Sequence, residues 1–196
     1  MCRQLDRVKH KNPIELLEES PVIAAVKDDH GLETCLKSEC TMVFILYGNI
    51  CNISEITKKI KQTGKIPIVH VDLIYGLGKK EIIVDFIKKN TQAEGIISTN
   101  SLIVKHAQEL GLYGVQRTFV IDSMALSNLK KQLMSFHPDF VEIMPGVISR
   151  VLREVRKETD IPLIAGGLLS EKKEMMDAFN AGADAISTTR EELWYV

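Results

Sequence analysis

Eight short apolar runs recur along the chain, and their spacing constrains the fold more than any other feature. They start at residues 22, 42, 66, 95, 114, 140, 162 and 185, so successive starts lie 19 to 29 residues apart. Such runs are typical of strands in a parallel sheet that helices cover on the outside. The predicted strands are Val22–Val26, Met42–Tyr47, Ile66–Val71, Gly95–Ser98, Gly114–Thr118, Phe140–Ile143, Pro162–Ala165 and Ala185–Ser187.

Amphipathic segments fill the intervals between these runs. Apolar residues recur three and four positions apart in Ile53–Gln62, Lys80–Lys89 and Val147–Lys157, which predicts helices with one buried face. Near the start, Asn12 followed by Pro13 has the pattern of an N-cap and a first helical residue, which predicts a short leading helix.

Eight strand–helix units predict a closed (β/α)8 barrel of the TIM type, because an open sheet of eight strands would leave two uncovered edges. The last unit has room only for a truncated helix at Glu191–Val196. That short ending leaves an open, doubly wound sheet as the alternative fold. In domain terms, we expect a polar N-terminal extension at residues 1–12 and a single barrel domain at 13–196.

Charge and hydropathy argue against two kinds of partner. The 25 Lys and Arg residues nearly balance the 26 Asp and Glu residues, so only a local patch could attract a polyanion. No apolar run approaches the roughly 20 residues of a membrane span, and the polar start is unlike a signal peptide. The four cysteines form no CxxC pair. We therefore expect a cytoplasmic protein with reduced thiols and no membrane partner.

Polar side chains interrupt the apolar strands near their carboxyl ends, where barrels of this kind carry their functional sites. Because a buried ion is costly unless it is paired, these residues predict a convergent polar pocket. They are Lys27, His70, Asp72, Ser98, Arg117 and Glu142. A purely structural ion network is the alternative interpretation. No metal motif is present, although His70, Asp72 and Glu142 could hold Mg²⁺, and Lys27 could form a Schiff base.

Two further strand ends predict a phosphate site. Gly166 and Gly167 follow the seventh strand, and paired glycines let backbone amides approach an anion closely. Ser187 and Thr188 end the eighth strand and add hydroxyl groups. Many barrels hold phosphate at these two loops.

A basic stripe lies on the predicted helix after the sixth strand. Arg150, Arg153, Arg156 and Lys157 are spaced to share one side of that helix. We treat them as candidate RNA-binding residues, with a solvated helix face as the alternative.

In combination, the strand-end motifs resemble one family, the glycerol uptake operon antiterminator regulatory proteins. The matching segments are HVDLIYGL (70–77), GIIST (95–99), QR (116–117), VEIMPGVI (141–148), IAGGL (164–168), STT (187–189) and LW (193–194). They occur in the family's order and cover nearly everything from Pro21 to Trp194.

The resemblance implies a (β/α)8 transcription regulator that senses glycerol 3-phosphate and binds the leader mRNA of glycerol-utilisation operons, preventing premature termination. It implies no cofactor beyond this effector and no turnover, and a homo-oligomer is compatible with it. By position, Gly166, Gly167, Ser187 and Thr188 would hold the phosphate, and the polar pocket would surround the glycerol hydroxyls. The alternative is an isomerase or aldolase acting on a phosphorylated sugar or polyol, since barrels host many functions.

Overall fold

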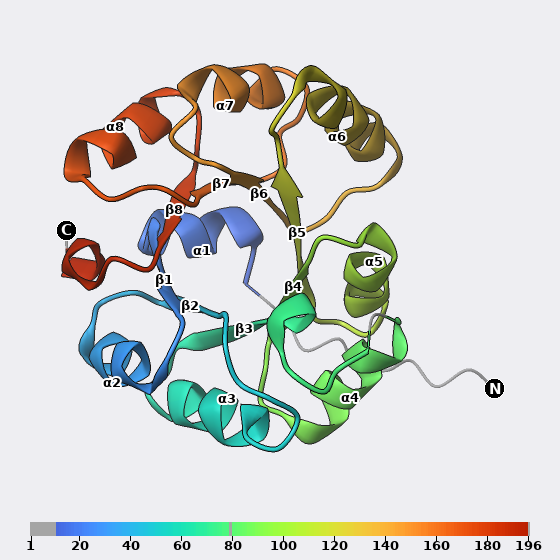
Figure 1. Ribbon diagram of the computed structural model, residues 1–196, viewed down its shortest axis with the longest axis vertical. Helices are drawn as coiled ribbons and strands as arrows, with labels where there is room; N and C mark the ends of the chain where they lie inside the picture. The colour runs from blue at the N-terminus through green and yellow to red at the C-terminus, as the bar shows by residue number, and fades with distance from the viewer. Residues whose placement is uncertain (1–10, 79, 196) are drawn as a thin grey trace.

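The chain closes into a barrel of eight parallel strands, arranged in chain order with β1 beside β8 (Figure 1). The computed structural model describes residues 11–78 and 80–195, so most of the predicted N-terminal extension lies outside the described residues. The strands are β1 (Val22–Val26), β2 (Met42–Ile45), β3 (Ile66–His70), β4 (Gly95–Ser98), β5 (Tyr113–Phe119), β6 (Phe140–Met144), β7 (Leu163–Gly166) and β8 (Ala185–Thr188). The predicted (β/α)8 barrel is confirmed, and the open doubly wound sheet is wrong, because β1 and β8 are paired.

Helices surround the barrel and follow the strands in alternation (Figure 1). They are α1 (Pro13–Glu19), α2 (Asp29–Lys37), α3 (Ile53–Gln62), η1 (Val71–Leu73), α4 (Ile82–Asn90), α5 (Ser101–Glu109), α6 (Ser123–Ser135), α7 (Ser149–Arg156), α8 (Lys172–Asn180) and η2 (Glu191–Tyr195). None of the helices within 11–78 and 80–195 combines the length and apolar character that a bilayer crossing requires.

Two apolar layers hold the barrel together. Inward-facing strand residues such as Phe44, Ile68 and Phe140 form one fully buried cluster, while the alternate residues pack against the surrounding helices. Leu16 and Leu17 of α1 join the inner cluster, so α1 closes the end of the barrel where the strands begin. Asn12 caps α1 as predicted, its Oδ1 accepting the Ile14 N–H at 3.0 Å.

The eighth unit ends in a 3₁₀ turn, η2, which agrees with the predicted truncated helix. Trp194 of η2 is buried, and its indole Nε1 donates to the Thr188 carbonyl at 2.9 Å. The buried Trp194 side chain thus binds the end of β8, which is followed by the short η2 turn and not by a full α-helix.

Removing a ring from the inner cluster should destabilise the whole barrel. Phe44 is fully buried, so Phe44→Ala should lower the free energy of unfolding by about 3–5 kcal/mol through lost contacts and a residual cavity. Met134→Ala, at a side chain that is 83% exposed, serves as the control and should change it by less than about 0.5 kcal/mol. Urea unfolding of the three proteins measures the difference. Equal losses in the two variants would contradict the assigned inner core.

Candidate functional site

A buried carboxylate shared by two donors lies at the carboxyl end of the barrel. Glu142 on β6 is fully buried; its Oε2 accepts from Arg117 Nε on β5 at 2.6 Å, and its Oε1 accepts from Ser187 Oγ on β8 at 2.5 Å. A buried charge of this kind is tolerated only when partners of this quality satisfy it. We call these three residues the Glu142 triad.

Gly166 on β7 lies between the two sides of the triad. A Cβ at Gly166 would stand 2.5 Å from Glu142 Oε1 and 2.6 Å from Ser187 Oγ. The absence of a side chain on β7 therefore lets the β6 carboxylate and the β8 hydroxyl meet. This accounts for Gly166 without any anion, whereas Gly167 and the following Leu168 have left-handed backbones, with φ of 75° and 60°.

His70 adds a neutral imidazole to the same end of the barrel. Burial and, to a lesser extent, the nearby Arg117 guanidinium together lower the pKa of His70 to about 4, against the opposing effect of the Asp72 carboxylate. Its Nδ1 is buried and has no hydrogen-bond partner within the described part of the chain. A neutral imidazole can donate from one ring nitrogen and accept at the other, which suits a hydroxyl group.

Asp72 and Ser98 serve mainly to join two loops. Asp72 Oδ1 accepts from Ser98 Oγ at 2.8 Å, while Oδ2 accepts from the backbone N–H of Thr99 at 2.8 Å and from its hydroxyl at 3.0 Å. Both side chains lie at the predicted strand ends, but their polar atoms bind each other. The ends of β3 and β4 are held together by this carboxylate.

Two connected hollows open beside the triad. The inner one, about 90 Å³, is lined by Arg117, Glu142 and Ser187 together with Gly167 and other loop residues. The outer one, about 720 Å³, is an open pocket between the ends of β1, β7 and β8. Leu168, Leu169 and Thr189 line both hollows, so a ligand can span them.

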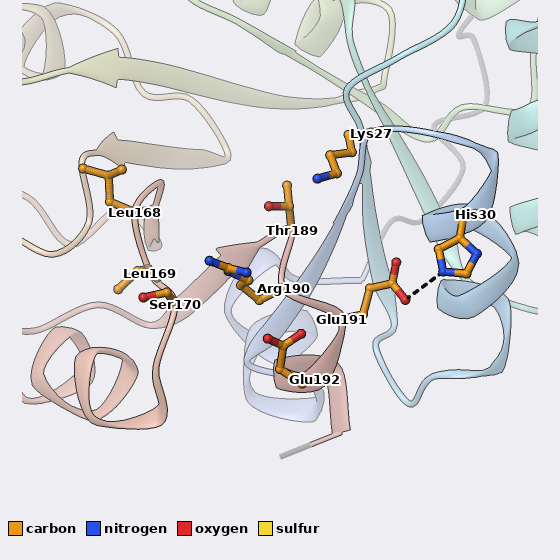
Figure 2. Close-up of a pocket in the computed structure, with 9 residues that line it drawn as sticks. All are labelled: Lys27, His30, Leu168, Leu169, Ser170, Thr189, Arg190, Glu191 and Glu192. Atoms are coloured by element: carbon orange, nitrogen blue, oxygen red, sulfur yellow. Dashed lines mark ion pairs between the residues drawn. The ribbon is translucent and has the colours of Figure 1, made fainter.

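The outer pocket carries two cationic side chains (Figure 2). Lys27 from the end of β1 and Arg190 from the end of β8 lie on either side of Thr189, and neither makes an ion pair among the residues described. His30 and Glu191 face each other farther out, at 3.8 Å. Sequence reasoning missed Arg190, Ser170 and His30, although Arg190 directly follows the Ser-Thr-Thr segment that marked this loop.

The predicted phosphate hydroxyls have protein partners instead. Ser187 donates to Glu142, and Thr188 Oγ1 donates to the Leu169 carbonyl at 3.1 Å while accepting from the Arg190 N–H at 3.1 Å. Thr188 thereby ties the loop after β7 to the loop after β8. Besides Lys27 and Arg190, the outer pocket is lined by the carboxylate residues Glu191 and Glu192 and by His30, Leu168, Leu169, Ser170 and Thr189.

The basic stripe on α7 is divided in the structure. Arg156 donates to the carbonyls of Ile161 and Gly182, both at 3.1 Å, and pairs with Asp184 at 2.7 Å, so it fastens α7 to the start of β8. Lys157 lies 3.2 Å from Glu154 on its own helix. Arg150 and Arg153 are exposed and have no ion pair within the described ranges. In those ranges, no group of three or more His, Cys, Asp or Glu residues could hold a metal ion.

Comparison with known proteins assigns the chain to a family. A family model described as glycerol-3-phosphate responsive antiterminator matches residues 22–194. The chain is 44% identical over 181 residues to the Escherichia coli (strain K12) protein described as uncharacterized protein YgcP, covering 92% of this chain and 95% of that protein.

Two solved structures agree with that assignment. A glycerol uptake operon antiterminator regulatory protein from Listeria monocytogenes is 27% identical with a TM-score of 0.85, over 89% of this chain and 95% of that one. An antiterminator-related protein of the same operon type from Thermotoga maritima is 31% identical with a TM-score of 0.78, over 88% and 96%. The chain therefore belongs to the glycerol-3-phosphate responsive antiterminator family.

The lowered pKa of His70 should make stability depend on pH. Between pH 6.5 and about 4 the unfolded chain binds a proton at this imidazole and the folded chain does not, so stability falls as the pH falls. The slope is at most about 1.4 kcal/mol per pH unit. His70→Gln removes this contribution, so the difference in unfolding free energy between wild type and variant should shrink from pH 7 to pH 4.5 in urea titrations. Parallel pH profiles would contradict the assignment of a buried neutral histidine.

Proposed function

We propose that this member of the family binds glycerol 3-phosphate at the barrel mouth and, in response, binds the leader of a glycerol-utilisation mRNA to prevent premature termination. The observation that carries the proposal is an open pocket with two unpaired cations that continues into a polar cavity, in a chain whose family is described as responsive to this ligand. The two hollows match the two ends of the ligand. The phosphate needs cations and backbone amides, and the glycerol needs hydroxyl partners.

In the proposed complex, the phosphate lies in the outer pocket between Lys27 and Arg190, beside Leu168 and Leu169 of the loop after β7. The hydroxyl groups reach inward to the Glu142 triad. Only Nε of Arg117 is hydrogen-bonded among the described residues, which leaves the rest of the guanidinium for the ligand. The unpartnered Nδ1 of His70 lies at the same end of the barrel.

Binding without turnover fits the state of the acid–base candidates. Both oxygens of Glu142 accept from protein donors, and Asp72 accepts from three donor atoms in the neighbouring loop. Lys27 is exposed, so it lacks the desolvation that activates a lysine for Schiff-base chemistry. Proteins of the aldolase type share the barrel, but the fold does not specify the reaction.

Removing a pocket cation should weaken ligand binding selectively. Lys27→Gln and Arg190→Gln each delete one charged partner of the phosphate, worth about 1.5–3 kcal/mol, so the dissociation constant for glycerol 3-phosphate should rise roughly 10- to 100-fold in calorimetry. Lys37→Gln is the matched control, because Lys37 is an exposed lysine at the end of α2, remote from the pocket. Unchanged affinity in both pocket variants would place the phosphate elsewhere.

The regulatory role is tested with RNA. In a gel shift with a glycerol-operon leader transcript, glycerol 3-phosphate should increase retention, since a ligand shifts a conformational balance only by its differential affinity for the two states. Phosphorus NMR of the protein with excess glycerol 3-phosphate is run in parallel. No retention with or without the ligand would contradict the antiterminator proposal, and steady conversion of the ligand would favour the alternative enzyme on a phosphorylated polyol.

A further inference from the structure

A further hollow, apart from the two at the mouth, lies on the outside of the barrel between the first turns of α6 and α7. It measures about 370 Å³ and shares no lining residue with the two hollows at the mouth. Its lining is Val120, Ile121, Asp122, Ser123, Leu126, Ile148, Arg150, Val151 and Glu154. We call it the α6/α7 groove. Five of these side chains are aliphatic, and two of the five, Ile121 and Ile148, are exposed.

The groove lining carries two carboxylates, which both have partners, and one guanidinium, which has no carboxylate partner among the described residues. Asp122 caps α6, its Oδ1 accepting from the Ala125 N–H at 2.7 Å. Glu154 is held by Lys130 at 3.5 Å and by Lys157 at 3.2 Å. Arg150, four residues before Glu154, has no carboxylate partner among residues 11–78 and 80–195, and neither has Arg153 one turn farther along α7. An aliphatic lining with the unpaired guanidinium of Arg150 beside it is complementary to a planar group that carries an anion, and Arg153 lies three residues farther along α7.

We propose that the α6/α7 groove receives an unpaired base of single-stranded RNA, with the adjoining phosphates on Arg150 and Arg153. This inference rests on the proposed function and assigns its RNA contact. Sequence-dependent recognition of RNA acts on splayed-out single-stranded bases, which stack on aromatic rings or on guanidinium planes such as the one that Arg150 supplies here. The volume is at the lower end of the roughly 300–1,000 Å³ range of ligand sites, as a single base requires.

The groove is connected to the effector cavity through two strands. Its walls are the loops after β5 and β6, and these strands carry Arg117 and Glu142. Met144 lines the inner cavity, and its carbonyl accepts the N–H of Val120, a groove residue, at 2.8 Å. Glycerol 3-phosphate bound against Arg117 and Met144 would therefore act on the backbone that shapes the groove.

The test uses the full chain and a fluorescent glycerol-operon leader transcript in the presence of glycerol 3-phosphate. Arg150→Glu/Arg153→Glu should weaken RNA binding at least tenfold and reduce the log–log salt slope by about 1.4, since each lost single-strand phosphate contact removes about 0.7. Ser123→Trp fills the groove without a charge change and should weaken binding at least fivefold. Circular dichroism and calorimetry with glycerol 3-phosphate must match wild type for both variants.

Lys58→Glu/Lys88→Glu is the matched control, with the same charge reversal on exposed lysines of α3 and α4, across the barrel from α6 and α7 (Figure 1). It should leave RNA affinity within twofold of wild type. If the wild type binds RNA and both groove variants bind it equally well, the RNA contact is not in the groove, while the proposed function stands. Absence of wild-type binding overturns both. Light scattering covers a further outcome: if the groove variants convert a dimer to a monomer and still bind RNA, the groove is a subunit interface and the proposal is wrong.

Discussion

The shared carboxylate of Glu142 is the constraint around which the functional end of the barrel is organised. It is fully buried, so Arg117 and Ser187 must both reach it, and these come from strands on either side of β6. Deleting one partner of a buried ion pair costs about 3–5 kcal/mol, because the other charge is left uncompensated. The triad therefore fixes the relative positions of β5, β6 and β8, and it forces the intervening β7 residue, Gly166, to have no side chain.

The same triad determines the chemistry that the mouth offers to a ligand. Burial and the Arg117 cation together keep His70 neutral, so this imidazole adds no second positive charge beside Arg117 at this end of the barrel. The remaining cations, Lys27 and Arg190, lie outside in the open pocket. Separation of a neutral, buried polar end from an exposed cationic end is the polarity that a phosphorylated polyol has.

The sequence predicted the architecture well because buried parallel strands leave a simple pattern. The bounds of β1 and β4 were predicted to the residue, and the period required eight units. It also placed Arg117 and Glu142 in one pocket, because both interrupt apolar strands near the same end. Their pairing depends on the β5–β6 register, which sets these two residues opposite each other and which no local pattern encodes.

The partners of other side chains could not be predicted from residue type, because they depend on which distant segments lie nearby in the fold. Ser187 was predicted to face an anion, but it lies opposite Gly166 in the register and reaches past it to Glu142. Arg156 shares the spacing of Arg150 and Arg153, yet the loop at Gly182 and Asp184 comes within its reach. Contacts between segments some 25 residues or more apart decide both cases, and helical or strand periodicity carries no information about them.

The rigidity of the barrel limits how a signal can leave the mouth. The Glu142 triad and the Asp72 contacts tie neighbouring strand ends together, and Thr188 joins the loops after β7 and β8. The loops after β5 and β6 are attached at their first residues, where the Val120 N–H donates to the Met144 carbonyl at 2.8 Å and the Gly146 N–H to the Gly166 carbonyl at 2.6 Å; beyond these contacts, Ile121 and Ile148 are exposed. Packed interiors resist deformation, whereas exposed loops open at low free-energy cost. Under the proposed function, a ligand held by Arg117 and Glu142 would therefore act most readily on the two loops that follow their own strands, which favours a responsive surface beside α6 and α7 over one at the far end of the barrel.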